Sequence, residues 1–324
     1  MKLPDIAKFT GRRVLLAVPM VLGVAVVNFL LIKAAPGDPA QILVGDYPAP
    51  PGYLEQIRHD YGLDQPLAIQ LLRYLGEVAQ GHLGYSFANR QPVATLILER
   101  LGPTLLLTVT ALTFASLLGI ALGILSARRA GSRIDAAVQV VSLAGYSVPE
   151  FWLGQMLILV FAVWLGWLPA QGSASLRSGI APGMLERMSY LLLPALALSL
   201  RYLALIARIT RAAMIQALSA DYVLAARLRG ASETRVVLAH ALRNAAAPIV
   251  TIIGTNAGFV LAGSALIETV FGWPGIGRLL FTSISQRDTP VMLGILLLVS
   301  VTVVLANLIT DILHQMLDPR VSGG

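Results

Sequence analysis

The sequence contains no cysteine and few charged residues. Without cysteine the chain can form neither disulfides nor thiolate metal sites, although this absence does not indicate the compartment. Charged residues make up 13% of the 324 positions and hydrophobic residues 56%, and the mean hydropathy is +0.74. This composition excludes an ordinary soluble globular domain, so we expect an integral membrane protein.

Lysine is also scarce, and its three occurrences are Lys2, Lys8 and Lys33. None of them completes the pattern G-x-x-x-x-G-K-[ST], so the chain cannot hold a nucleotide in a phosphate-binding loop of that kind. We therefore expect no cofactor, metal or catalytic residue on this chain. An ATP-driven process would need a partner chain to hold the ATP.

The net charge of +7 arises from 24 lysines and arginines against 17 acidic residues. A basic balance can indicate nucleic-acid binding, but in so apolar a chain it is better explained by charge sorting across a bilayer. We expect the lipid bilayer, and no nucleic acid, among the partners.

Six apolar stretches are long enough to cross about 30 Å of hydrocarbon, which takes roughly 20 helical residues. The first is longer than the apolar core of a signal peptide, which has about 7–15 residues, so we interpret it as a retained span. We expect an all-α fold with six transmembrane helices near residues 13–33, 104–126, 138–165, 189–210, 248–270 and 291–313.

Basic residues near the span ends predict the orientation, because they accumulate on the cytoplasmic side. The side that includes both termini carries more basic residues and is therefore predicted to be cytoplasmic. It carries Lys2, Lys8, Arg12, Arg13, Arg128, Arg129, Arg133, Arg208, Arg211, Arg227, Arg229, Arg235, Arg243 and Arg320, whereas the short loops opposite carry Arg177, Arg187, Arg278 and Arg287.

These spans divide the chain into four regions. Residues 1–33 form the N-terminus and first span, and residues 34–103 form an extracytoplasmic cap. Within the cap, Pro66 precedes a helix with Leu67, Leu71, Leu72, Leu75 and Val78 on one face. Residues 104–313 form the transmembrane core, with a loop at 211–247 and an outer insert at 271–290 that includes a short amphipathic stretch. Residues 314–324 form a cytoplasmic tail.

The loop contains the stretch DYVLAARLRGASETRVVLAHALRNAAAP, from Asp221 to Pro248, which predicts a helix, a glycine turn and a second helix. Asp221 or Ser219 is expected to cap the first helix, and Val223, Leu224 and Leu228 are its apolar positions. Gly230 ends that helix, and Ser232 begins the next.

Small side chains at Ala225 and Ala226 would let another protein approach the first helix closely, with Arg227 and Arg229 supplying charge. The alternative is that the arginines only hold the loop in the cytoplasm and that the alanines are ordinary helix formers. The residues alone do not decide between these readings.

The same stretch resembles the cytoplasmic EAA loop of binding-protein-dependent ABC importer permeases, in the branch for dipeptides, oligopeptides and nickel. The wider family has glutamate where Leu224 stands, so any role of that glutamate is in doubt here. The resemblance covers nearly the whole chain and rests on Asp221, Tyr222, Val223, Ala226, Arg227, Gly230, His240 to Ala245 and Pro248, with Pro36 to Pro39, Tyr61 to Pro66, Gly81 to Phe87, Phe271 to Leu280, Asp311 and Asp318 to Arg320.

This resemblance implies the fold of a type I ABC importer permease, with a coupling helix between the fourth and fifth spans that rests on a separate ATPase. The implied coupling residues are Asp221, Tyr222, Ala225, Ala226, Arg227, Arg229, Gly230 and Arg235. The implied partners are a second, similar permease chain, two ATPase subunits that hold ATP and Mg, and an extracytoplasmic substrate-binding protein. The implied location is the bacterial inner membrane, and the implied mechanism is alternating access.

Two charged residues fall inside predicted spans, where they require a cavity or a partner. Counting the helical rise from opposite membrane faces puts Glu150 and Arg201 at similar depths, so we expect them to pair or to line a cavity together. Either they form only a structural ion pair, or they contact a zwitterionic peptide at its amine and carboxylate. Glu268 is a weaker candidate, because it lies near a span end where water is expected.

The substrate of first choice is a di- or oligopeptide, with glutathione, nickel or a metal chelate as alternatives. A stand-alone secondary transporter or channel would be expected to show paired half-chains with broken helices, and no such repeat is visible, although Pro149 could break the third span. A membrane-bound enzyme would need clustered histidines or paired carboxylates, and Glu150 has no acidic neighbour.

Overall fold

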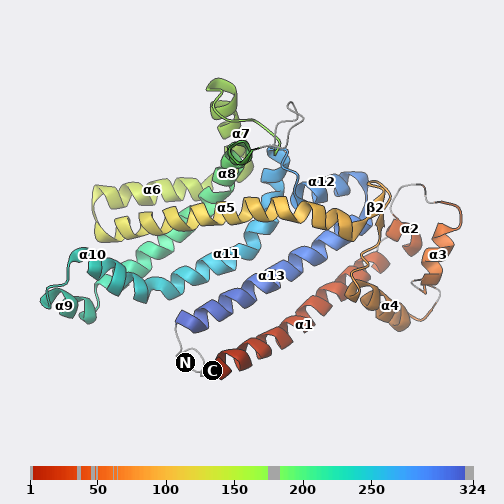
Figure 1. Ribbon diagram of the computed structural model, residues 1–324, viewed down its shortest axis with the longest axis horizontal. Helices are drawn as coiled ribbons and strands as arrows, with labels where there is room; N and C mark the ends of the chain where they lie inside the picture. Colours follow the sequence, from red (N-terminus) through yellow and green to blue (C-terminus); the bar gives the residue numbers. More distant parts are fainter. Residues whose placement is uncertain are drawn as a thin grey trace.

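The computed structural model of the chain describes residues 3–34, 38–44, 48, 50–60, 62–63, 65–173 and 183–317. The long helices lie side by side along the longest axis of the molecule (Figure 1). They are α1 (Leu3–Ala34), α5 (Val93–Arg128), α6 (Arg133–Ser147), α8 (Met184–Leu218), α11 (Leu242–Val270) and α13 (Thr289–Leu317). Lys2, Pro36, Gly37, Tyr61, Asp64, Arg177 and the predicted tail from Asp318 lie outside the described residues.

The described residues contain four helices that are long and apolar enough to cross a membrane: Val93–Arg128, Met184–Leu218, Glu233–Val260 and Thr289–Ile312. A bent pair, Arg133–Ser147 with Glu150–Trp164, would be a fifth span. In α1 the described apolar stretch is Leu15–Leu31, which is shorter than the roughly 20 residues that a membrane span needs. The fold is therefore an all-α membrane fold, while the first of the six spans remains a prediction.

The third predicted span, residues 138–165, is wrong as a single straight helix. It bends by 101° between α6 and the next helix, α7 (Glu150–Leu157), which continues as the π-helical segment η1 (Ile158–Trp164). Pro149 causes the bend, because proline has no backbone N–H and forces the preceding residue out of the helical region. Val148 accordingly has extended angles, with φ −75° and ψ 128°.

The most extensive helix–helix contact joins α5 and α8 and includes two glycines spaced as G-x-x-x-G. A Cβ atom at Gly119 would lie 2.9 Å from the carbonyl oxygen of Leu203, and one at Gly123 would lie 2.5 Å from Thr210 Cβ. Glycines at this spacing let two membrane helices approach at the level of their backbones. The backbones of α5 and α8 are therefore in close contact at these two glycines.

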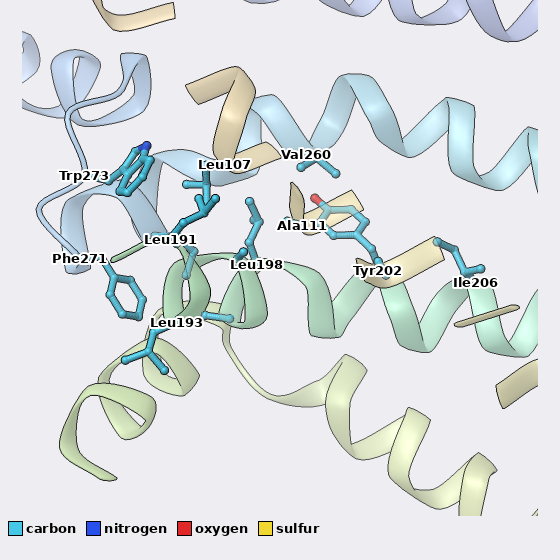
Figure 2. Close-up of a cluster of buried hydrophobic side chains, with 14 residues drawn as sticks. Leu107, Ala111, Leu191, Leu193, Leu198, Tyr202, Ile206, Val260, Phe271 and Trp273 are labelled. Atoms are coloured by element: carbon cyan, nitrogen blue, oxygen red, sulfur yellow. The ribbon is translucent and has the colours of Figure 1, made fainter. Parts of the chain in front are cut away.

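A buried apolar cluster lies beside this contact and involves four segments of the chain (Figure 2). α5 contributes Leu107 and Ala111, and α8 contributes Leu198 and Tyr202. Trp273 closes the outer end of the cluster, where its indole N–H donates to the carbonyl oxygen of Pro103 at 2.9 Å.

The region predicted as a cap lies at one end of the molecule and contains α2 (Pro39–Val44), α3 (Tyr53–Asp60), α4 (Leu67–Ala79) and a small hairpin of β1 (Tyr85–Ser86) and β2 (Gln91–Pro92) (Figure 1). Arg58 binds Asp38, and this hydrogen bond is the main cause that lowers the pKa of the Asp38 carboxyl. Helix α4 begins after Pro66 as expected, and Leu67 and Leu72 of its predicted apolar face are exposed.

The outer insert contains the expected short helix, α12 (Ile276–Gln286). Glu268 holds the first turn of this helix. It was expected to lie near water, but its side chain is fully buried. The Glu268 carboxylate accepts hydrogen bonds from Thr104 Oγ1 at 2.8 Å, Ser264 Oγ at 3.1 Å and the backbone N–H of Arg278 at 3.0 Å. The positive end of α12 thus stabilises a carboxylate that would otherwise be costly to bury.

Gly275 makes room for this carboxylate, since a Cβ atom there would lie 2.3 Å from Glu268 Cδ. Its backbone angles, φ −103° and ψ −177°, suit any residue, so Gly275→Ala tests the steric contact alone. We expect this substitution to destabilise the protein by about 1–3 kcal/mol, because the crowded carboxylate must leave its hydrogen bonds. The melting temperature of the purified protein measures the effect. Gly183→Ala is the control, since nothing lies within 4 Å of a Cβ atom at Gly183.

Candidate coupling and translocation sites

The helix-glycine-helix arrangement predicted for residues 221–248 is present. Helix α9 (Asp221–Leu228) is followed by a turn, by the short helix α10 (Glu233–Arg235) and by the π-helical segment η2 (Val236–Ala241), which continues into α11. Gly230 adopts φ +79°, and the N–H of Ala231 donates to the carbonyl oxygen of Ala226 at 3.1 Å. This is the left-handed helix end that the glycine predicted.

The capping prediction for α9 is wrong. Ala220 occupies the N-cap position, Asp221 is the first helical residue, and Ser219 ends α8. The short link between α8 and α9 explains the difference, because it leaves no separate capping segment. Asp221 is exposed in the first turn of α9, where its negative charge suits the positive end of the helix.

The inward and outward faces of α9 also differ from the prediction. Val223 and Ala226 are buried and pack with Val236 and Leu218, so Ala226 is not part of an open docking face. Leu224 and Leu228 point outward instead and are 58% and 81% exposed, and Tyr222 beside them is 39% exposed. Leu224 and Leu228 are four residues apart and therefore share one side of the helix. Ala225 is half-buried.

The arginines of the loop have different environments. Arg227 forms two hydrogen bonds with Glu233, from Nε at 2.8 Å and from Nη2 at 3.3 Å, and so joins α9 to α10 across the Gly230 turn. Arg229 and Arg235 are exposed on either side of that turn. Exposed apolar side chains ringed by charge form a surface suited to protein contact.

The loop that contains α9 packs firmly against the long helices. Met214 of α8 packs with Ala127 of α5 and with Val237 and Ala241 of η2 in one buried cluster. The surface of α9 is thus supported on its inner side by helices that run through the whole molecule. A displacement applied to α9 would be passed to those helices and not absorbed by a loose loop.

Glu150 and Arg201 meet as the depth estimate predicted. Arg201 Nη1 lies 3.7 Å from Glu150 Oε1, and the Arg201 guanidinium lies over the ring of Tyr146, 5.5 Å from its centre. The Glu150 side chain is 14% exposed and that of Arg201 is 53% exposed. The pair is thus anchored by its glutamate and presents its arginine outward from α8.

A cavity of about 250 Å³ adjoins this pair between α6 and α8. Its walls are mainly apolar and include Val138, Leu143, Tyr146 and Leu205. Tyr146 belongs both to the cavity wall and to the cation-π contact of Arg201, so the charge pair lies beside the cavity, although neither of its residues lines it.

A bundle of long apolar helices with an exposed apolar surface at one end and a charge pair beside a cavity is typical of a membrane transport protein. Two family profiles match the chain: "Binding-protein-dependent transport system inner membrane component" over residues 119–323, and the N-terminal membrane component of the same system over residues 6–108. The chain belongs to this family of ABC importer permeases. It is a multi-pass inner-membrane protein, of a class that works with ATPases and binding proteins.

Full-length relatives support this assignment. The chain is 42% identical to the di/tripeptide transport system permease protein DppB of Pseudomonas aeruginosa (strain UCBPP-PA14), over 97% of this chain and 98% of that one. It is 39% identical to the oligopeptide transport system permease protein AppB of Bacillus subtilis (strain 168), over 97% and 99%. It is 41% identical to the glutathione transport system permease protein GsiC of Escherichia coli (strain K12), over 96% and 97%.

Solved structures show the same fold in part of the chain. An inward-facing structure of the MetNI methionine ABC transporter matches with a TM-score of 0.55 and 20% identity, over 69% of this chain and 96% of that one. An amino acid ABC transporter structure matches with a TM-score of 0.51 and 19% identity.

Proposed function

We propose that this chain translocates di- and oligopeptides into bacteria by alternating access, driven by separate ATPase chains that hold ATP and Mg and contact α9. The supported surface of Leu224 and Leu228 carries this proposal, because it is apolar, exposed and rooted in the transmembrane helices. The peptide substrate is supported by the names of the di/tripeptide and oligopeptide relatives, which match over nearly their whole length.

The proposed assembly contains this chain, a second homologous permease, two ATPase subunits and an extracytoplasmic binding protein. The α9 end faces the cytoplasm, and the first turn of α1 and the last turn of α13 lie toward that same end (Figure 1). Both termini would then be cytoplasmic. The binding protein docks on the cap and on the outer insert 271–290, at the opposite end.

In this proposal the translocation path passes the Glu150–Arg201 pair. Arg201 offers an exposed guanidinium that can bind the peptide carboxylate in a bidentate manner, while Glu150 faces the amine. The apolar cavity beside them would accept the side chains of a peptide without selecting among them.

Arg201→Leu tests this role. We expect peptide uptake by the assembled transporter to fall at least about tenfold, because a charge-assisted hydrogen bond of roughly 1.5–3 kcal/mol is lost. The rate of uptake in proteoliposomes is measured against the amount of assembled complex. Arg187→Leu is the control, since it removes an arginine from the outer end of the same helix. Unchanged uptake would show that the Glu150–Arg201 pair has only a structural role.

Glutathione is the second candidate substrate, since relatives named as glutathione permeases are 41% identical to this chain. Nickel and metal chelates remain alternatives without a comparison that favours them. Competition of unlabelled glutathione, dipeptides and nickel against uptake of a labelled dipeptide would rank these substrates.

A stand-alone transporter or channel is the alternative of another class. The purified chain reconstituted without partners separates the two. ATP-dependent uptake that appears only when the ATPase chains are added supports the importer, whereas accumulation of solute by the chain alone would contradict it.

A further inference from the structure

We infer that the ion pair between Asp135 and Arg211 makes the α5–α6 hairpin move with α8 and the coupling helix as one body. Asp135 and Arg211 are positioning residues in this scheme. The pair carries the displacement of α9 to α6, and through α6 to Glu150. The inference rests on the proposed function, because it concerns how the ATPase-driven movement spreads within this chain.

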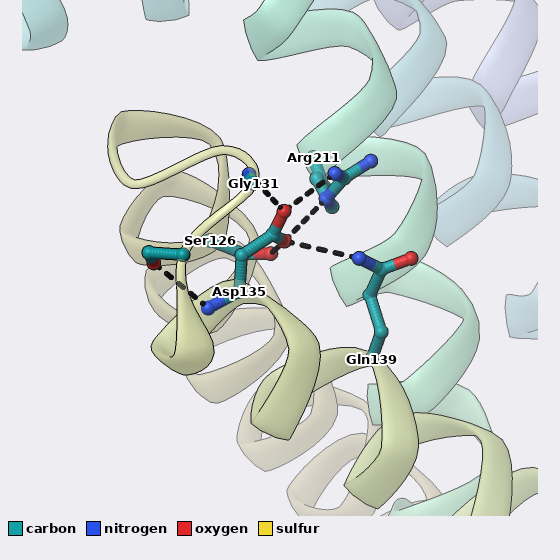
Figure 3. A network of polar contacts seen from close by, with 6 residues as sticks. Ser126, Gly131, Asp135, Gln139 and Arg211 are labelled. Atoms are coloured by element: carbon teal, nitrogen blue, oxygen red, sulfur yellow. Dashed lines mark hydrogen bonds and ion pairs between the residues drawn. The ribbon is translucent and has the colours of Figure 1, made fainter.

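The geometry of the pair is that of a rigid clamp (Figure 3). Arg211 Nε donates to Asp135 Oδ1 and Nη2 donates to Oδ2, both at 2.7 Å. A planar guanidinium that binds both carboxylate oxygens fixes direction as well as distance. The two residues are 76 positions apart and belong to α8 and α6, so the contact joins elements that the chain itself does not connect closely.

Three further donors fix the Asp135 carboxylate. α5 supplies Ser126 Oγ, which lies 2.5 Å from the carboxylate, and the turn supplies the N–H of Gly131 at 2.9 Å. α6 itself supplies Gln139 Nε2 at 3.2 Å (Figure 3). The residue is only 2% exposed. One buried carboxylate thus ties together both helices of the hairpin, the turn between them and α8. A buried carboxylate with so many donors is costly to displace, so the contact resists sliding.

The clamp is connected to the coupling helix by uninterrupted structure. From Arg211 the helix α8 continues without a break to Leu218, and Leu218 packs against Val223 and Ala226 of α9. Seven residues of helix therefore separate the clamp from the inner face of α9. A movement of α9 reaches Arg211 through a stiff element.

The clamp is also connected to the translocation site along two parallel routes. Helix α6 runs from Asp135 to Ser147 and leads over the Pro149 bend to Glu150, while α8 carries Arg201 directly. If α8 moved without α6, Arg201 would shift past Glu150 and Tyr146. With the clamp closed, both halves of the charge pair move together and the site keeps its shape.

If the ion pair only stabilised the fold, its loss would lower the stability or the amount of the complex. Transport and ATP hydrolysis would then fall together. Loss of a coupling link leaves hydrolysis in the assembled complex and lowers the solute carried per ATP. The ratio of transport to hydrolysis therefore separates the two.

Asp135→Asn in the complete transporter is the first test, because it keeps the side-chain shape and removes the charge. In proteoliposomes we expect dipeptide transported per ATP hydrolysed to fall at least about threefold. Arg133→Gln is the matched control, since it removes an exposed charge from the first turn of the same helix, and its ratio should equal that of the wild type. Arg211→Lys keeps the charge but not the two-pronged geometry and should give an intermediate ratio. If the Asp135→Asn transporter does not assemble, Arg211→Lys serves as the test variant.

A distance measurement gives an independent readout. The absence of cysteine from this chain allows spin labels on Ala130→Cys in the hairpin turn and Ser219→Cys at the end of α8. In the assembled transporter we expect the same narrow distance distribution with and without ATP, and a shift on ATP binding in the Asp135→Asn background. A wild-type distance that changes by several ångström on ATP binding would overturn the inference, as would an unchanged transport ratio in both clamp variants. Failure of the wild-type complex to show ATP-dependent uptake would instead overturn the proposed function.

Discussion

Leu228→Asp is expected to reduce ATP-dependent uptake strongly while leaving the transmembrane bundle folded. Leu228 is 81% exposed at the end of α9 and makes no contribution to the buried cluster beneath it, which contains Val223 and Ala226. An aspartate there would place an unpaired charge in the proposed ATPase contact. We expect the affinity for the ATPase chains to fall about thirtyfold, corresponding to roughly 2 kcal/mol for a central apolar contact, and uptake to fall with it.

The measurement is co-purification of the ATPase chains with this permease, together with dipeptide uptake by proteoliposomes. Leu228→Met is the control, since it keeps an apolar side chain of similar volume and should bind and transport as the wild type does. The melting temperature of the isolated permease should be the same for all three proteins. Normal ATPase binding by Leu228→Asp would show that the contact lies elsewhere on the loop.

Gly123→Val is expected to have the largest effect on folding. A Cβ atom at this position would lie 2.5 Å from Thr210 Cβ and 2.7 Å from the carbonyl oxygen of Ala207. The carbonyl belongs to the backbone of α8 and cannot turn away as a long side chain could, so α5 and α8 must separate. We expect a loss of about 3 kcal/mol or more, because the overpacked contact lies between two central helices.

The amount of folded protein in the membrane and its melting temperature in detergent measure this loss. Gly23→Val in the interior of the long helix α1 is the control, because nothing lies within 4 Å of a Cβ atom at Gly23 and no proline follows it. It changes helix propensity to the same extent without a steric clash, and its melting temperature should stay near that of the wild type. Equal behaviour of the two variants would show that the glycine contact is not what holds α5 to α8.

The candidate sites illustrate where sequence reasoning succeeded. Gly230 predicted a left-handed turn because that conformation strongly favours glycine. Glu150 and Arg201 were expected to meet because charged residues inside a membrane helix require partners and because helical rise converts position into depth. These are local rules that need no knowledge of neighbouring helices.

Other features were missed because they depend on which surfaces become buried. The docking side of α9 was assigned to Ala225 and Ala226, yet the fold buries Ala226 and exposes Leu224 and Leu228. Helical periodicity defines the sides of a helix but not which side meets the protein. A leucine at position 224, where the wider family has glutamate, was a signal for an exposed position. Glu268 was expected near water, but the folding back of α12 covers it completely.

By itself the sequence determined that the chain is a helical membrane protein, approximately where most of its spans lie, and that two helices flank Gly230 in a basic loop. Hydrophobic length, charge and glycine are properties of short segments, and a bilayer acts on segments directly. Pro149 also indicated a break in the third span, because proline disrupts a helix locally. Only the tertiary structure decided the outward face of α9, the burial of Glu268 and the contact of Asp135 with Arg211. Each of these depends on contacts between residues distant in the sequence, and the free energy of such contacts exists only once the helices have packed.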